Sequence, residues 1–222
     1  MRTVIFDLDG TLADTSQDLL NAANMCFQGL GLGDLLNVET DQKVAMMGGG
    51  RAMLQLGFER AGATEIPAKI EQYYDMFLGL YGESIDVHTR LYPGAETGIE
   101  ALGNAGYAIG VCTNKPEVFA QDLLVRLGVR SLFGSLVGAD TLPVRKPDPR
   151  PMHEAVRRVG GDVKKSILVG DSPTDRDTAR AAGVKSLLVT FGPDGGNVAQ
   201  LHPDALLDDY GDLGDAVTRL IG

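Results

Sequence analysis

The chain has 222 residues and carries 20 lysines and arginines against 30 aspartates and glutamates, a formal net charge of −10. This length is enough for one large domain or two modest ones with a buried core. The negative balance argues against a nucleic-acid partner, because backbone phosphates would be repelled and no basic run offsets the charge. A small anion remains compatible with this charge if a few cations gather in a local pocket.

Nothing in the sequence indicates a membrane segment or export. No apolar run approaches the roughly 18 residues of a membrane span, and residues 4–6 are too few for the core of a signal peptide. The two cysteines, Cys26 and Cys112, lie in apolar stretches and have neither metal-site spacing nor a disulfide framework. We therefore expect buried thiols, no membrane partner and a cytoplasmic protein.

The first stretch that suggests chemistry is at residues 4–10. Three apolar residues run into Asp7, and Gly10 follows Asp9. The pattern predicts a short buried strand whose carboxyl end carries two carboxylates. In an extended backbone Asp7 and Asp9 share one face, which is costly unless a cation lies between them or one stays protonated. A polar strand end followed by an Asp-Gly turn is the alternative without chemistry.

Residues 15–86 show helical periodicity and no strand pattern. A first helix is expected after the capping residues 14–16 and ends near Gly31, because apolar residues there recur every three or four positions. Further helices are expected over residues 40–47, from 51 to about 61, and after Pro67, with the glycines at 48–50 separating two of them. The pattern predicts an all-helical block inserted directly after the first strand.

From residue 92 onward, strands alternate with helices. Strands are expected at residues 107–113, 135–138, 166–169, 186–190 and 205–207, and helices at 95–104, 116–127, 148–159, 173–182 and 213–220. Such alternation implies right-handed crossovers and a doubly wound parallel sheet with helices on both faces. The expected fold is α/β, with residues 1–14 and 87–222 in one domain and the helical block 15–86 in a second.

Polar residues follow three of these expected strands. Asp7 and Asp9 follow the first, residues 113–115 the second, and Asp171 a later one. Ligands of parallel sheets bind at the carboxyl ends of the strands, so these side chains are expected on one rim. Three carboxylates suit Mg²⁺, and Lys146 adds a positive charge for an anion. Each feature is weak by itself, since a lysine before a proline is usually a solvated loop residue.

Four motifs carry a resemblance to a known superfamily. They are Asp7-Leu8-Asp9-Gly10-Thr11, Thr113-Asn114-Lys115-Pro116, Lys146-Pro147-Asp148-Pro149 and Gly170-Asp171-Ser172-Pro173-Thr174-Asp175. In type and order they resemble the motifs of the haloacid dehalogenase superfamily, and the resemblance covers the whole chain. It implies a Rossmann-like core and a helical cap at residues 15–86. Within the superfamily, the motifs look most like those of phosphoglycolate phosphatases.

The resemblance implies a covalent route through Asp7. Asp7 attacks phosphorus and forms an aspartyl-phosphate, while Asp9 protonates the leaving alkoxide and later takes a proton from the hydrolytic water. Asp7 and Asp171 bind Mg²⁺ through carboxylates, and Asp9 contributes its backbone carbonyl. Asp9 also argues against dehalogenase chemistry, because that branch has no alkoxide to protonate.

The resemblance assigns the remaining motif residues to the phosphoryl group. Thr113, the amide of Asn114 and Lys146 hold the phosphoryl oxygens and neutralise their charge. Asp175 orients Lys146 or a metal-bound water.

The glycine run before Arg51 is the candidate for substrate selection. It is compatible with a plain helix–helix turn and an exposed arginine. In the resembling enzymes, however, the cap loop at this position faces the catalytic rim. Gly50 and Arg51 are therefore candidate substrate-binding residues, the guanidinium pairing with a substrate carboxylate.

The function expected from the sequence is Mg²⁺-dependent hydrolysis of a small phosphate monoester, with 2-phosphoglycolate as the expected substrate. Phosphatases of sugar phosphates, nucleotides or pyrophosphate, and a phosphomutase, are alternatives on the same scaffold. A phospho-accepting switch protein also places a strand-end aspartate on a parallel sheet, but it needs neither a leaving-group acid nor a cap. The partner is expected to be a small phosphate ester, and the protein a monomer or homodimer.

Overall fold

The computed structural model describes residues Met1–Gly222 and divides the chain into two compact units. The α/β unit comprises Met1–Asp14 and Leu91–Gly222, and the helical unit comprises Thr15–Arg90. No helix combines the length and the apolar character that crossing a bilayer requires. Both cysteines are free and buried, as expected.

The α/β unit is built on a six-stranded sheet in the order β5-β4-β1-β6-β7-β8. The strands are β1 (Thr3–Phe6), β4 (Ala108–Cys112), β5 (Ser135–Val137), β6 (Ser166–Gly170), β7 (Lys185–Val189) and β8 (Ala205–Leu207). Every neighbouring pair is parallel, and Phe6 of β1 lies opposite both Val111 and Val169. The central strands are apolar because both faces of a parallel sheet are covered.

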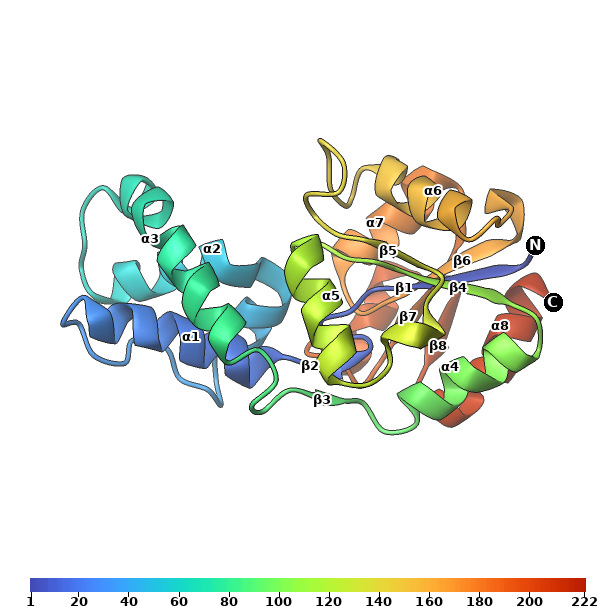
Figure 1. Ribbon diagram of the computed structural model, residues 1–222, viewed down its shortest axis with the longest axis horizontal. Coiled ribbons are helices and arrows are strands. Elements are labelled where there is room, and N and C mark those ends of the chain that lie inside the picture. The colour runs from blue at the N-terminus through green and yellow to red at the C-terminus, as the bar shows by residue number, and fades with distance from the viewer. The chain divides into compact units, whose positions relative to one another are not determined.

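Helices cover both faces of this sheet (Figure 1). They are α4 (Ala95–Asn104), α5 (Glu117–Arg126), α6 (Pro149–Arg158), α7 (Pro173–Ala182) and α8 (Leu213–Ile221). Helices α6 and α7 pack on one face, α4 and α8 on the other, and α5 packs against β5 at the edge. One core cluster joins Ile5 and Leu168 of the sheet to Met152 and Val156 of α6. The expectation of a doubly wound parallel α/β sheet is confirmed.

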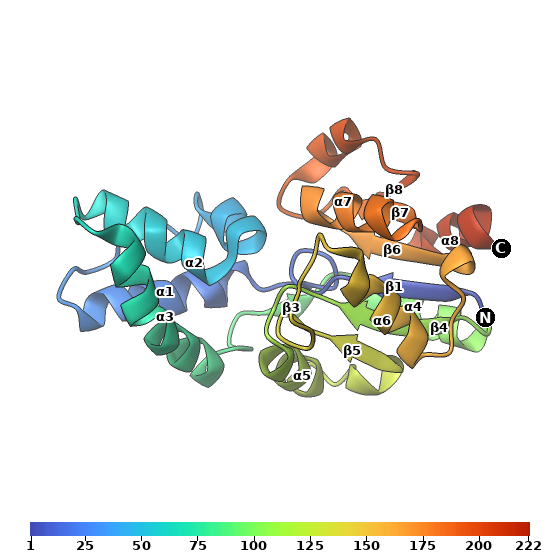
Figure 2. The ribbon, with the colours of Figure 1, turned by 90° about the horizontal axis from the view of Figure 1, so that it is seen from above.

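The helical unit contains α1 (Ser16–Gly29), α2 (Gln42–Arg60) and α3 (Ile66–Glu83), which pack against one another (Figure 2). The rings of Phe27 and Phe58 meet edge to face, 5.4 Å between centroids. Helix α2 is interrupted at Gly49, whose φ of 63° and ψ of −166° are not helical. Two helices therefore meet at Gly49 within α2, and the break predicted at the glycine run is present.

Two features of this region differ from the sequence pattern. The chain passes between the units through the two-residue strands β2 (Ala13–Asp14) and β3 (Arg90–Leu91), which pair with each other. Strands this short show no periodicity. Thr15 precedes α1 but its side chain forms no cap; its hydroxyl instead lies 3.4 Å from Met46 Sδ.

The carboxylate of Asp18 joins the first and last segments of the helical unit. It accepts hydrogen bonds from the backbone N–H groups of His88 and Thr89 at 2.8–3.0 Å and from the Thr89 hydroxyl at 2.8 Å. Asp18 is fully buried. These bonds attach residues 88 and 89 to the first turn of α1, which explains why the helical unit extends beyond the expected boundary at residue 86.

We predict that Asp18→Ala lowers the free energy of unfolding by about 2–4 kcal/mol, because it leaves several buried donors without an acceptor. The measurement is urea unfolding followed by circular dichroism. Glu96→Ala is the matched control, since Glu96 is an exposed acid in the first turn of α4 and its loss should cost less than about 0.5 kcal/mol. Equal effects of the two substitutions would contradict the anchoring role of Asp18.

Candidate active site

Asp7 stands at the carboxyl end of the central strand β1. Its backbone N–H continues the sheet by donating to Val169 O at 2.9 Å, and its Oδ1 accepts from the N–H of Leu8 at 2.7 Å. Its other oxygen, Oδ2, lies 3.0 Å from Nζ of Lys146. The strand therefore places the carboxylate, and a lysine from the loop between β5 and α6 meets it.

Lys146 is shared between two carboxylates. Its Nζ also donates to Oδ1 of Asp175 at 2.6 Å, and its side chain is only 1% exposed. Burial works against the ammonium form, but the negative charges of Asp175 and Asp7 outweigh it and raise the pKa of Lys146. The ammonium is thus a permanent positive charge beside Asp7.

Asp175 serves as the anchor of this group. It opens α7 with a capping box, in which Ser172 Oγ accepts from the N–H of Asp175. Its Oδ2 accepts from the N–H groups of Asp171 and Ser172 at 3.2 Å and from Ser172 Oγ at 2.5 Å. Both oxygens are therefore committed, one to Lys146 and one to the start of the helix.

Asp171 follows β6 and lies beside the turn after β1. The hydroxyl of Thr11 donates to its Oδ1 at 2.7 Å. Gly10 has a φ of +80°, and a Cβ atom there would lie 2.5 Å from Asp171 Oδ2, so only glycine allows this approach. Burial, together with the charges of Asp175 and Asp7, raises the pKa of Asp171 well above its ordinary value.

The acidic groups fit a divalent cation. Oxygen atoms of Asp7, Asp171 and Asp175 lie within 4.8 Å of one another. Burial raises the pKa of Asp7 to about 7, although Lys146 opposes the shift. Two buried acids with raised pKa values mark a place where a further positive charge would be stabilising. Because Asp175 is already committed to Lys146 and its own helix, Asp7 and Asp171 have the more available oxygens.

The carboxylates of Asp9 and Asp7 pair with different lysines. Strand β1 ends at Phe6, so the alternation that would place both carboxylates on one face stops before Asp9. The Asp9 carboxylate instead accepts from Nζ of Lys115 at 2.9 Å, and the lysine side chain is 4% exposed. Each carboxylate of the first motif is paired with a different lysine. These pairings reduce the electrostatic repulsion expected between Asp7 and Asp9.

The sequence placed Lys115 on the rim but did not predict its bond to Asp9. Lys115 stands in the second motif between Asn114 and Pro116, and no role follows from the motif pattern for it. The available signal was its position directly after a strand whose end faces that of β1.

Thr113 and Asn114 follow β4 on the same rim. Thr113 is buried, and its Oγ1 accepts from the N–H of Lys115 at 3.1 Å. The side-chain amide of Asn114 donates to the backbone carbonyl of Lys146 at 3.0 Å. Asn114 thus attaches the Lys146 loop to the end of β4. The structure brings together all the predicted rim residues of the α/β unit.

Gly50 and Arg51 belong to the helical unit and have partners within it. Arg51 forms a two-pronged ion pair with Glu71 and stacks 4.4 Å over the ring of Tyr74. A Cβ atom at Gly50 would overlap the ring of Phe77, so packing alone requires a glycine there.

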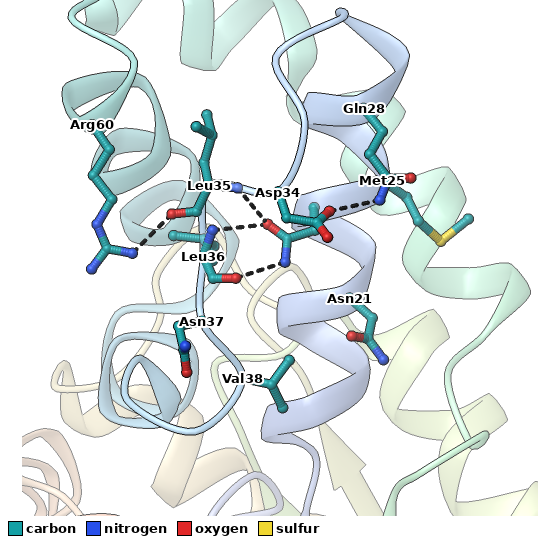
Figure 3. Close-up of a pocket in the computed structure, with 10 residues that line it drawn as sticks. Asn21, Met25, Gln28, Asp34, Leu35, Leu36, Asn37, Val38 and Arg60 are labelled. Atoms are coloured by element: carbon teal, nitrogen blue, oxygen red, sulfur yellow. Dashed lines mark hydrogen bonds between the residues drawn. The ribbon is translucent and has the colours of Figure 1, made fainter.

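The helical unit also has a surface pocket between α1 and the loop that follows it (Figure 3). The Asn24 side chain accepts from the N–H groups of Leu35 and Leu36 and donates to Leu36 O. Arg60 donates to Leu35 O at 2.9 Å. These bonds fasten the loop to α1 and α2, and no cluster of catalytic groups lines the pocket.

Comparisons with known proteins find relatives over most of the chain. The family model described as haloacid dehalogenase-like hydrolase matches residues 4–189. A phosphoglycolate phosphatase of Agrobacterium fabrum is 39% identical over 215 residues, with 96% of this chain and 91% of the relative covered. One of Mesorhizobium japonicum is 36% identical over 216 residues, covering 97% and 92%.

A solved structure has a similar fold. The crystal structure of a predicted phosphoglycolate phosphatase from Haemophilus somnus 129pt aligns with a TM-score of 0.86 at 29% identity, covering 97% of each chain. Both the family match and the relatives extend over most of the sequence. The chain therefore belongs to the haloacid dehalogenase-like hydrolase family.

Proposed function

We propose that this phosphoric monoester hydrolase acts on 2-phosphoglycolate, with Mg²⁺, through an aspartyl-phosphate on Asp7. The observation that carries the chemistry is the buried Lys146 ammonium, 3.0 Å from Asp7 and 2.6 Å from Asp175. It holds a strand-end carboxylate at the place where a parallel sheet presents ligands. The substrate follows from the relatives, which are phosphoglycolate phosphatases.

The proposed reaction has two displacements at phosphorus. A carboxylate oxygen of Asp7 forms a bond to phosphorus while the bond to the substrate's alkoxide breaks, and Asp9 gives that alkoxide a proton. A water molecule then forms a bond to phosphorus as the bond to Asp7 breaks. Asp9 takes the proton of this water, so inorganic phosphate leaves and both aspartates return to their starting forms.

The charge of the phosphoryl group is balanced by groups on the same rim. Lys146 supplies a fixed positive charge, since the pKa of its ammonium is raised. The Thr113 hydroxyl and the backbone N–H of Asn114 are donors for phosphoryl oxygens. When bound by Asp7, Asp171 and the backbone carbonyl of Asp9, Mg²⁺ would supply a second positive charge against these oxygens. Asp175 holds Lys146 in place.

Discrimination between esters is assigned to the helical unit, because the rim residues act only on the phosphoryl group. We propose that Arg51 recognises the substrate's carboxylate by bidentate pairing. Its side chain is 45% exposed, and in this role it would exchange the carboxylate of Glu71 for that of the substrate.

A substrate panel tests the proposed function as a whole. Purified protein with Mg²⁺ should release phosphate from 2-phosphoglycolate faster than from sugar phosphates, nucleotides or pyrophosphate. Chelation of divalent cations should abolish the release. A phosphomutase would instead move the phosphoryl group to a second hydroxyl without releasing phosphate, and that result would replace the proposal.

We predict that Asp7→Asn abolishes turnover and the acid-stable phosphoenzyme, because an amide cannot form the acyl phosphate. The measurements are phosphate release and trapping of the enzyme with labelled substrate. Asp122→Asn, at a partly exposed acid of α5 paired with Arg126, should leave both unchanged. Clear residual turnover in Asp7→Asn would rule out the covalent route.

We predict that Asp9→Asn slows hydrolysis of 2-phosphoglycolate by about 10²–10⁴-fold, the usual contribution of an acid–base group. p-Nitrophenyl phosphate, whose leaving group needs little protonation, should keep a fast first step. Burst kinetics with both substrates separate the two displacements. An equal loss of burst rate for both would assign Asp9 a structural role only.

We predict that Arg51→Ala lowers kcat/KM for 2-phosphoglycolate. The loss corresponds to about 2–5 kcal/mol of transition-state stabilisation, as expected when one partner of a charge pair is removed. p-Nitrophenyl phosphate has no carboxylate, so its kcat/KM should change by less than about tenfold. Glu71→Gln is the matched control, because it removes the internal ion pair but leaves the guanidinium. If Glu71→Gln were as damaging as Arg51→Ala, Arg51 would act through the fold of the helical unit.

A further inference from the structure

Tyr210 makes an unexpected contact with the turn after β1. It lies in the 3₁₀ turn Tyr210–Asp212 (η4), which joins β8 to α8, and its side chain is buried. Its hydroxyl donates to the backbone carbonyl of Thr11 at 2.8 Å, across 199 positions of sequence. Burial, with the charges of Tyr92 and Asp171, raises the pKa of this phenol, so it remains a donor at any working pH.

Thr11 is hydrogen-bonded to both Tyr210 and Asp171. Its backbone carbonyl receives the Tyr210 hydroxyl, and its own hydroxyl donates to Asp171 Oδ1 at 2.7 Å. Thr11 is fully buried. The next carbonyl, Leu12 O, accepts from the N–H of Tyr92 at 3.0 Å. Two consecutive carbonyls of the turn are thus held, and the side chain of the first of these residues, Thr11, points its donor at an acid of the rim.

An aromatic cluster holds Tyr210 in place. The ring of Phe191 lies 4.9 Å from that of Tyr92 and 5.3 Å from that of Tyr210, centroid to centroid. The residue after Phe191 is Gly192, where a Cβ atom would lie 2.8 Å from Gly10 O and 2.9 Å from Asp171 Cβ. The segment that carries Phe191 therefore also packs against Gly10 and the side chain of Asp171. The cluster leaves little room for the turn or the acid to shift.

We propose that Tyr210 is a positioning residue for Asp171, acting through Thr11 to aim this carboxylate at a bound divalent cation. The proposal rests on the metal-binding role of Asp171 in the proposed function. Removing the phenol oxygen leaves the carbonyl of Thr11 without its buried donor. The turn then relaxes, the Thr11 hydroxyl loses its fixed direction, and Asp171 is less well placed to bind a cation.

The test is Tyr210→Phe, which keeps the ring and its packing and removes one oxygen. Direct binding of Mn²⁺, followed by electron paramagnetic resonance, and of Mg²⁺, followed by calorimetry, should show dissociation constants raised about three- to tenfold. The Mg²⁺ concentration for half-maximal hydrolysis of p-nitrophenyl phosphate should rise by the same factor. The kcat at saturating Mg²⁺ should stay within about twofold of wild type.

Two further variants separate positioning from stability. Tyr107→Phe is the matched control, because Tyr107 is also buried but precedes β4, at the opposite end of the sheet from Asp171. It should leave metal affinity unchanged. Thr11→Val should reproduce the defect of Tyr210→Phe, whereas Thr11→Ser, which keeps the hydroxyl, should retain most of the affinity.

Unchanged Mn²⁺ and Mg²⁺ affinities in Tyr210→Phe would overturn the proposal, even if its melting temperature falls. An equal loss of affinity in Tyr107→Phe would also overturn it. If the wild type binds no divalent cation at all, the metal-binding role of Asp171 in the proposed function fails together with this inference. If it binds the cation but does not hydrolyse 2-phosphoglycolate, only the substrate assignment fails, and the binding experiment still decides the role of Tyr210.

Discussion

The arrangement of the rim depends on one buried ammonium group. Lys146 has almost no contact with water, and its charge is balanced by Asp7 and Asp175. Removing either carboxylate would leave a buried charge with only part of its compensation, a situation that costs about 3–5 kcal/mol when an ion pair is broken completely. The three residues come from the ends of different elements, so this interaction also fixes where β1, the loop before α6, and α7 meet.

The second lysine of the rim divides the acids into two groups. Lys115 binds Asp9, while Lys146 binds Asp7, although the two acids are separated by only one residue. In the proposed reaction these acids have different tasks, one bonding to phosphorus and the other moving a proton. Separate cations allow the protein to set the surroundings of each acid independently. The fold achieves this by ending β1 at Phe6, so that Asp7 and Asp9 point to different neighbours.

Much of the α/β unit could be predicted from the sequence, because its strands are short apolar runs that alternate with amphipathic helices. Helices α4 and α7 and strand β8 have the expected bounds, and the strand-end rule correctly predicted that Asp7 and Asp171 would meet. The roles of these residues in catalysis remain predictions.

What the sequence did not reveal depends on contacts across long separations. The pairing of Lys115 with Asp9 spans 106 positions, and the bond from Tyr210 to Thr11 spans 199. Lys115 was expected on the same rim as Asp9, but nothing singled out Asp9 as its partner, and no pattern places Tyr210 near Thr11. Strands β2 and β3 have two residues each, too few for any periodicity to appear. The ion pair of Arg51 with Glu71 arises from the packing of α2 on α3, which a helical pattern alone does not orient.

The bonds from Asp18 to His88 and Thr89 have a consequence for how the chain folds. Strand β1 pairs with β4, with Phe6 opposite Val111, although the whole helical unit lies between the two strands in the sequence. Closing so long a flexible loop carries an entropic cost, and pairings of distant strands fold slowly for this reason. Once the helical unit has folded, Asp18 holds residues 88 and 89 beside the start of α1. The folded unit then brings its own two ends together. The loop that must close for β1 to pair with β4 is therefore shorter in effect, and closing it costs less entropy.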